Sequence, residues 1–204
     1  QSWDRVVCKG YPVCHPDNLF VWNYHMKDEA INYLDMSAKK IKILGSPVWD
    51  YIFNKKGLIS KAEFFKKMNL DTNKKTVYYP LNSAFWHDEL MINLEQIYLA
   101  KKNKIIKKDL QFIIRIHPYY WRNDKLRKKL FEKLKLFDEI DEIYVDYNEI
   151  HESKSANFIN SKDLNFTINC YNHCDICLSV ISSSMIEMIF CGKPALNFLY
   201  GKWI

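Results

Sequence analysis

Polar groups that can bind an anion follow three apolar runs in the second part of the chain. Asn82 and Ser83 follow the first run, Arg115 and His117 close the second, and Ser182, Ser183 and Ser184 follow the third. Small hydroxyls and free backbone amides at the start of a helix form a ready site for phosphate. The residue types therefore predict an anion site if the three runs lie side by side.

Each of these groups also has a structural interpretation. A serine that precedes a helix commonly caps it, and Ser182 stands in such a place. A buried arginine needs a partner, which for Arg115 is either a diphosphate or a carboxylate such as Asp109 or Asp146. Glu187 lies one turn further along the chain, where a carboxylate can accept hydrogen bonds from a ribose diol.

Strands and helices that alternate along the chain must position these groups. Apolar runs predict strands at 19–22, 41–44, 76–79, 110–116, 143–147, 176–180 and 195–198, and helical periodicity predicts helices at 26–34, 60–70, 87–106, 124–137, 163–173 and 183–191. Ser60 and Glu63 form a capping box at the start of one helix, and residues 148–161 fit neither pattern. This order predicts an α/β, Rossmann-like parallel sheet with helices on both faces. Ligands of such sheets bind outside the carboxyl ends of the strands.

Composition narrows the class of protein. The 204 residues are 48% hydrophobic and 26% charged, which is ordinary for a globular chain, and the formal net charge is +6. The excess lysines fall on predicted amphipathic helices, so we expect a solvated surface and no nucleic acid partner; a weak peripheral attraction to anionic lipid stays open. No apolar run is long enough to span a bilayer and no signal peptide is visible. We expect a cytoplasmic protein, with the inner face of the membrane as a second location.

Three cysteines have a spacing that suggests a metal cluster. Cys170, Cys174 and Cys177 match the CxxxCxxC pattern by which radical enzymes that use S-adenosylmethionine hold an iron–sulfur cluster. That pattern occurs early in a barrel of many later strands, whereas only 27 residues follow Cys177 in this 204-residue chain. We therefore expect reduced core thiols and no metal site.

Candidates for a catalytic base are few. His25 stands where a predicted strand meets a helix and is the one candidate we retain, against the alternative of an ordinary surface histidine. Cys14 and His15 are a nucleophile and a base in the abstract, but no third group is visible to orient them. The catalytic residues are otherwise unknown from the sequence.

Three segments resemble those of a known enzyme family. Residues 175–198, with the serine turn, Glu187 and Gly192-Lys-Pro before the last strand, resemble the donor-binding segment of glycosyltransferases with the two-domain GT-B fold. The run Arg115-Ile-His-Pro118 looks like the Arg-x-His-Pro turn of the branch that builds bacterial surface polysaccharides and teichoic acids, which includes CDP-glycerol glycerophosphotransferases. Residues 19–50 are similar to the end of the first domain in that family.

The resemblance implies a division of the chain and roles for its residues. Residues 1–47 would be the tail of an N-terminal acceptor domain, 48–75 the interdomain helices and linker, and 76–204 the donor domain, so that the chain is a fragment. Ser182, Ser183 and Ser184 would hold the donor phosphate, Glu187 the ribose, and Arg115 with His117 the diphosphate leaving group. Cationic and amide groups stabilise that leaving group, so no metal and no cofactor beyond the nucleotide donor is expected.

We therefore predict a transferase that moves a glycosyl or glycerol-phosphate group from a nucleotide-diphosphate sugar or CDP-glycerol to a glycan or lipid-linked acceptor. Because the acceptor domain is mostly absent, this part of the enzyme is expected to bind donor without transferring it. Two alternatives stay open: a noncatalytic nucleotide-binding module, and a non-hydrolysing nucleotide-sugar epimerase of the same fold.

Overall fold

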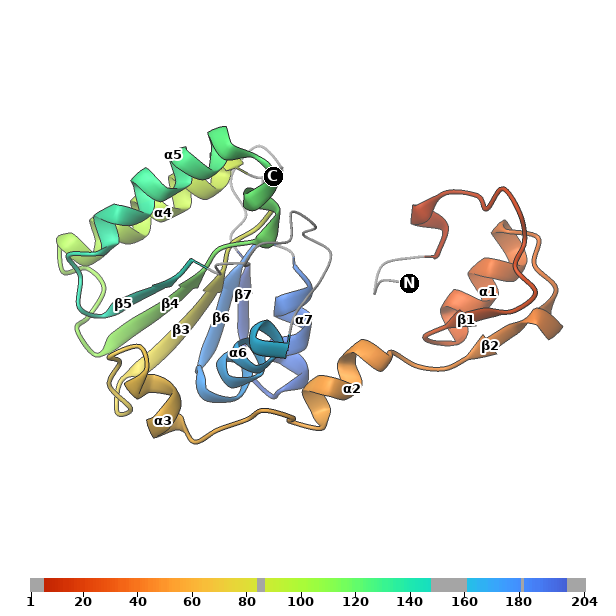
Figure 1. The fold of residues 1–204 in the computed structure, drawn as a ribbon, viewed down its shortest axis with the longest axis horizontal. Helices are drawn as coiled ribbons and strands as arrows, with labels where there is room; N and C mark the ends of the chain where they lie inside the picture. Colours follow the sequence, from red (N-terminus) through yellow and green to blue (C-terminus); the bar gives the residue numbers. More distant parts are fainter. Residues whose placement is uncertain (1–5, 84–86, 148–160, 181, 198–204) are drawn as a thin grey trace. The chain divides into compact units, whose positions relative to one another are not determined.

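The computed structural model describes residues 6–83, 87–147, 161–180 and 182–197 (Figure 1). The chain divides into two compact units, residues 1–54 and 55–204, which we call the N-terminal and C-terminal units. The divisions at residues 47 and 75 that the sequence suggests stay predictions.

The C-terminal unit contains a five-stranded parallel sheet in the order β5-β4-β3-β6-β7. Its strands are β3 (Lys75–Pro80), β4 (Leu110–Arg115), β5 (Ile143–Asp146), β6 (Ile176–Ser179) and β7 (Ala195–Asn197). Its helices are α3 (Lys61–Lys66), α4 (His87–Lys102), α5 (Asp124–Leu134), α6 (Ser161–His173) and α7 (Ser183–Phe190), with 3-10 turns η4 (Pro118–Arg122) and η5 (Lys135–Phe137). This confirms the predicted α/β class and the parallel sheet.

Helices cover both faces of this sheet (Figure 1). On one face, Tyr79 and Ile114 pack with Leu94 of α4 and Leu130 of α5 in a continuous apolar core. Alternate residues of each strand point to the other face, where Tyr78 meets the ring of Tyr171 from α6 edge-on. Burying each such large side chain contributes about 1.5–3 kcal/mol, so both helix layers are held by the sheet.

The N-terminal unit is a strand, helix, strand unit with its own small core. Strands β1 (Leu19–Val21) and β2 (Ile41–Ile43) pair in parallel, joined through α1 (Tyr24–Tyr33) and the 3-10 turn η2 (Ala38–Lys40). The 3-10 turn η1 (Val6–Lys9) precedes them and α2 (Pro47–Phe53) follows. The core holds Val6, Val21, Met26, Ala30, Leu34, Met36 and Ile41.

Element ends differ from the sequence prediction by a few residues. β3 begins at Lys75, the last residue of the range 48–75 expected to hold the interdomain helices and linker, because Lys75 N–H donates to the Asp109 carbonyl. The helix predicted for 60–70 ends at Lys66, and Asn69 adopts a left-handed conformation that stops it. Ser60 does cap α3 by accepting from Glu63 N–H, whereas the Glu63 carboxylate pairs with Lys67 instead of completing the capping box. Residues 148–160 lie outside the described residues.

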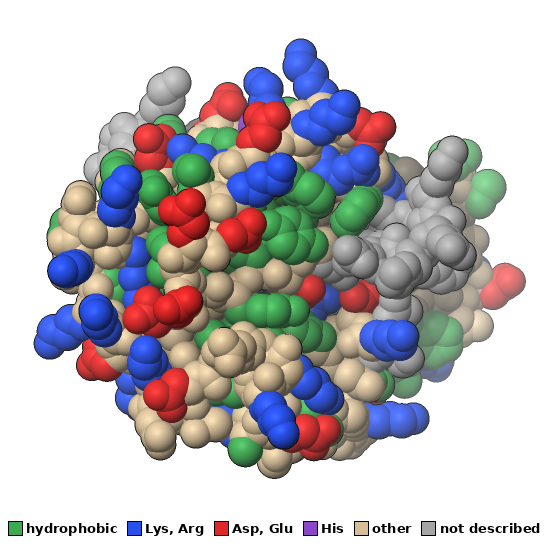
Figure 2. Space-filling model, turned by 60° about the vertical axis from the view of Figure 1, so that its left-hand side comes forward, with side chains coloured by type: hydrophobic (Ala, Val, Ile, Leu, Met, Phe, Trp, Pro, Cys, Tyr) green, Lys and Arg blue, Asp and Glu red, His purple; other side chains and the backbone are tan. Residues whose placement is uncertain are grey.

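Charge is dispersed over the face of the molecule that Figure 2 presents. Figure 2 shows basic and acidic side chains interspersed on the face it presents, without one continuous positive patch there. Among the described residues, no helix is both long and apolar enough to cross a membrane.

Candidate functional site

The chain reverses its direction of travel across the sheet between β3 and β6. From β3 it proceeds outward to β4 and β5, and then returns through α6 to place β6 on the other side of β3. In open α/β sheets the crevice outside the carboxyl ends of the strands at such a switch point is the usual ligand site. The turn after β3 carries Asn82 and Ser83, and the turn after β6 leads to Ser182, so the structure brings these predicted residues to that point.

Hydrogen bonds tie the two turns together. Asn82 Nδ2 donates to the Val180 carbonyl at 2.8 Å, and Asn82 Oδ1 lies 3.1 Å from the hydroxyl of Ser179. The Ser179 hydroxyl also lies 3.1 Å from that of Ser182. Asn82 and Ser179 are both buried, so this polar network holds the turns at a fixed separation. Ser83, next to Asn82, is half-buried.

Ser182 occupies the N-cap position of α7, but its side chain makes no capping hydrogen bond to the helix. Its hydroxyl pairs with Ser179 instead. The capping interpretation of Ser182 therefore does not describe its contacts. Ser183 is exposed in the first turn of α7 and Ser184 is half-buried, so the three serines present their hydroxyls in different surroundings.

Arg115 lies at the carboxyl end of β4 and is buried in an ion-pair network. Its Nε lies 3.4 Å from Asp146 Oδ2, and its NH2 group lies 3.1 Å from Asp163 Oδ1 at the start of α6. It also donates to Thr167 Oγ1, and the ring of Phe166 lies 4.8 Å from the guanidinium carbon. The carboxylate partner that the sequence left open is thus present in Asp146. A role toward a diphosphate stays a prediction, and it requires Arg115 to share its charge with these carboxylates.

His117 is held in one tautomer by the backbone. It caps η4, and its Nδ1 accepts from the Tyr119 N–H at 3.0 Å. Burial lowers the pKa of His117, so the ring is neutral at pH 7. Because Nδ1 is the acceptor, Nε2 carries the proton and is the nitrogen with which His117 can donate to an anion.

Glu187 faces helix α6 from the second turn of α7. The hydroxyl of Tyr171, a fully buried residue, donates a short hydrogen bond to Glu187 Oε2, and Ser184 also interacts with that phenol. A carboxylate held this way has a fixed rotamer. The ribose contact that the sequence suggests for Glu187 is untested, but the contact with Tyr171 would orient it.

Sequence reasoning missed Ser179 and Tyr171. Ser179 stands as the last residue of a strand that otherwise reads Ile, Cys, Leu, and a hydroxyl at that place is the one hint it offered. Tyr171 lies on α6, and its partner Glu187 lies 16 residues further along the chain on α7. No pattern in the sequence shows that these two helices are neighbours, so nothing in the sequence pairs the two residues.

The retained catalytic candidate, His25, lies in the first turn of α1 in the N-terminal unit. Its Nε2 lies 3.3 Å from Glu29 Oε1, with the imidazole 73% exposed and the carboxylate side chain 2% exposed. Glu29 Oε2 accepts from the Val6 N–H at 3.1 Å. A buried carboxylate that orients an exposed imidazole is an arrangement suited to a general base, and that role for His25 stays a prediction.

The cysteines form no metal site in the described part of the chain. No group of three His, Cys, Asp or Glu side chains there could hold a metal ion. Cys170, Cys174 and Cys177 are all fully buried among the helix–sheet contacts, and burial raises the pKa of Cys177 to about 12. A thiol with that pKa stays protonated, which suits a core residue.

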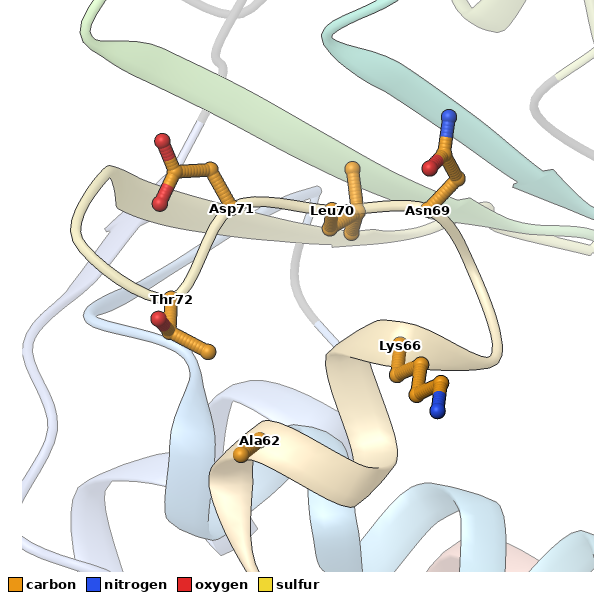
Figure 3. Close-up of a pocket in the computed structure, with 6 residues that line it drawn as sticks. All are labelled: Ala62, Lys66, Asn69, Leu70, Asp71 and Thr72. Carbon is orange, nitrogen blue, oxygen red and sulfur yellow. The ribbon is translucent and has the colours of Figure 1, made fainter.

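A surface depression of about 480 Å³ lies away from these turns (Figure 3). It is lined by Ala62, Lys66, Asn69, Leu70, Asp71 and Thr72. These residues precede β3, so the depression lies toward the side of the sheet where its parallel strands begin. We call this side the amino edge, and the side where the strands end the carboxyl edge. In Figure 3 the Asn69 and Asp71 side chains point away from Lys66 instead of converging on one point. The candidate site stays at the opposite, carboxyl edge, where the predicted residues lie.

Comparisons with known proteins bear on the fold. The chain matches no protein-family model and no curated protein sequence. It is similar to the solved UDP-GlcNAc 2-epimerase from Neisseria meningitidis bound to UDP-GlcNAc, with 19% identity, a TM-score of 0.62, and coverage of 89% of this chain and 44% of that one. It is also similar to the UDP-GlcNAc 2-epimerase from Methanocaldococcus jannaschii, with 16% identity, a TM-score of 0.59, and coverage of 89% of this chain and 46% of that one.

A third similar structure is the wall teichoic acid polymerase TagF, at 18% identity and a TM-score of 0.53, over 89% of this chain and 38% of that one. The chain thus spans less than half the length of each of these proteins. Likeness at this identity shows the fold, and the chain accordingly has the GT-B type of Rossmann-like α/β fold that its sequence predicts.

Proposed function

We propose that this chain is the donor-binding part of a GT-B enzyme that moves a glycosyl or glycerol-phosphate group from a nucleotide-diphosphate donor to a surface glycan or lipid-linked acceptor. The observation that carries the proposal is the hydrogen-bonded pair of turns at the switch point, where Asn82, Ser179 and Ser182 meet. The first turn of α7 opens from the same place, and its backbone N–H groups favour an anion.

The chemistry of transfer needs stabilisation of a departing nucleoside diphosphate. The neutral His117 offers a donor at Nε2, and Ser182, Ser183 and Ser184 offer hydroxyls. Arg115 lies at the same edge of the sheet, where it shares its charge with Asp146 and Asp163. Preorganised donors of this kind stabilise a leaving group without a metal. The similar TagF structure is that of a teichoic acid polymerase, which supports a glycerol-phosphate donor as one form of the proposal.

Calorimetric titration with CDP, UDP and GDP tests the shared core of the proposal. We expect one of the three to bind with a 1:1 ratio and the other two to bind more weakly. Absence of heat with all three, for a chain that shows a cooperative thermal transition, would overturn the proposal.

A nucleotide-sugar epimerase is the second candidate. It is favoured by the TM-scores, which are 0.62 and 0.59 for the two UDP-GlcNAc 2-epimerases against 0.53 for TagF. Incubation with UDP-GlcNAc separates the two: an epimerase converts the sugar without an acceptor, whereas a transferase does not. Nucleotide binding with neither reaction, in a chain extended to the length of its structural relatives, would favour a noncatalytic module.

A further inference from the structure

Ser179 has more polar neighbours than a strand residue needs. Its backbone pairs with β7 opposite Asn197, while its side chain is completely buried at the carboxyl end of β6. A buried hydroxyl requires only one or two partners to offset its desolvation. The surplus of partners around Ser179 indicates a role beyond its own satisfaction.

The neighbours come from both turns of the switch point. The Ser179 oxygen lies 3.3 Å from the Pro80 carbonyl and 3.1 Å from Asn82 Oδ1, both from the end of β3. It lies 3.2 Å from the Val180 carbonyl and 3.1 Å from the Ser182 hydroxyl, both from the turn after β6. One side chain thus bridges two chain segments that are about a hundred residues apart in sequence.

The hydrogen-bond direction along this network follows from the number of protons. Pro80, Val180 and Asn82 Oδ1 offer only acceptors to Ser179, so the single Ser179 proton can go to one of them. The hydroxyl of Ser182 is the remaining neighbour, and either hydroxyl of this pair can be the donor; when the Ser179 proton goes to one of the three acceptors, Ser182 donates to the Ser179 oxygen. In this arrangement the Ser182 hydroxyl donates to Ser179 when no ligand is bound, and it can rotate to donate the same proton to an incoming anion.

We infer that Ser179 is a positioning residue of the proposed donor site, which sets Asn82 and Ser182 for the phosphates of a nucleoside diphosphate. The inference rests on the proposed function. Ser179 does not contact the ligand; it fixes the amide rotamer of Asn82 and the resting place of the Ser182 proton. Replacing it with alanine removes one contact from each of these groups and a single buried oxygen, while Asn82 keeps its bond to the Val180 carbonyl.

The test is a double-mutant cycle on nucleoside diphosphate binding, measured by calorimetry with whichever of CDP, UDP or GDP the wild-type chain binds best. Ser179→Ala and Asn82→Ala are each expected to weaken binding about tenfold, the value of one hydrogen bond to a charged group. Because Ser179 acts through Asn82, the double variant is expected to lose much less than the roughly hundredfold that independent effects would give.

Thr76→Val is the matched control, because Thr76 has a buried hydroxyl in β3 at the opposite edge of the sheet, bonded to Gln111. It should lower the melting temperature by a similar amount and leave binding unchanged. Ser179→Cys keeps the side-chain volume and weakens the donor, and it serves if the alanine variant does not fold; its binding should also fall.

The outcomes separate the inference from the function. The inference alone is overturned if the wild-type chain binds the diphosphate and Ser179→Ala binds it with the same affinity. Where the alanine variant does not fold, the same comparison is made with Ser179→Cys. A fully additive cycle, or equal weakening by Thr76→Val, also overturns the inference. Absence of diphosphate binding by the wild-type chain overturns the proposed function, and the inference falls with it.

Discussion

The two edges of the five-stranded sheet use buried polar side chains in different ways. At the amino edge, Gln111 accepts from the Asp71 N–H and donates to the Asp71 carbonyl and to Thr76. At the carboxyl edge, the Ser179 hydroxyl joins Asn82 to Ser182, side chain to side chain, between two turns.

This difference separates side chains that satisfy the backbone from the hydroxyls that we propose to bind a ligand. Side chains that satisfy backbone groups cannot give up those bonds without leaving the backbone buried and unsatisfied. Hydroxyls that bond to one another can exchange a partner for a ligand at little cost, because a rotated hydroxyl finds a new acceptor. The amino edge therefore closes the fold. At the carboxyl edge Asn82 is also bonded to a backbone carbonyl, so the Ser179–Ser182 hydroxyl pair is the part that we propose can exchange a partner for a ligand.

The largest effect is expected from Arg115→Ala, which tests whether a carboxyl-edge residue can also be structural. Arg115 is only 8% exposed and supplies the shared cation for Asp146 and Asp163. Removing one partner of a buried ion pair costs about 3–5 kcal/mol. Urea unfolding should show a lower midpoint with an unchanged slope, and a loss below about 1 kcal/mol would show that the network contributes little.

The same variant bears on the donor site. If Arg115 also meets a diphosphate, binding should weaken at least tenfold even at temperatures where the variant is fully folded, since a charge-assisted hydrogen bond contributes about 1.5–3 kcal/mol. Asp163→Asn is the control, because it removes a partner of Arg115 but keeps the guanidinium. Equal affinity of the wild-type chain and folded Arg115→Ala would confine Arg115 to its structural role.

The next effect is expected from Gln111→Ala at the amino edge. It removes three hydrogen bonds to the Asp71 backbone and Thr76 and should destabilise the fold by about 2 kcal/mol. Nucleoside diphosphate affinity should stay within twofold of wild type, as calorimetry can show. Weaker binding in the folded variant would remove the contrast between the two edges.

A smaller effect is expected from Tyr171→Phe, which loses the donor to Glu187. If Glu187 binds the ribose, the variant should lose about fivefold of the preference for ribonucleotides over 2′-deoxynucleotides, or ~1 kcal/mol. Tyr120→Phe is the matched control, because its buried hydroxyl bonds to His87 and not to Glu187. An unchanged preference in Tyr171→Phe would leave the Tyr171 contact a structural one.

The sequence predicted the class of fold because its strands are apolar runs and its helices are amphipathic, and both patterns are local. It also predicted which residues lie at the carboxyl ends of the strands, since this follows from the order of elements; ligand binding there stays a prediction. The partners of Arg115 were harder to predict. Asp146 was one of two candidates, whereas Asp163 lies 48 residues from Arg115, on α6, and no local pattern in the sequence joins Arg115 to Asp163.

The Ser182 turn shows the same limit more sharply. A serine before a helix predicts a cap, and only the neighbouring strand end at Asn82 and Ser179 turns its hydroxyl elsewhere. Such contacts depend on which strands become neighbours and on register, and these are set by packing of the whole sheet. Residue types near a turn can therefore be predicted, while their partners require the structure.

The smallest effect on stability is expected from Asp175→Asn. Asp175 lies at the amino edge, where its carboxylate accepts hydrogen bonds from Lys75 and the Thr76 N–H, and we expect its contribution to depend on pH. Burial pushes the pKa of Asp175 upward, but hydrogen bonds from Lys75 and the Thr76 N–H outweigh it, so its pKa lies below the ordinary value. Because the folded pKa is the lower one, the stabilisation is present at pH 7 and is lost as the pH falls below about 4.

Lys75 is largely exposed, so solvent screening limits the loss in the variant to less than about 1 kcal/mol at pH 7. Melting temperatures of the two proteins should converge in acid, whereas Lys75→Met should retain part of the pH dependence through Thr76. A gap that stays constant into the acid range would show that Asp175 contributes through packing and not through its charge.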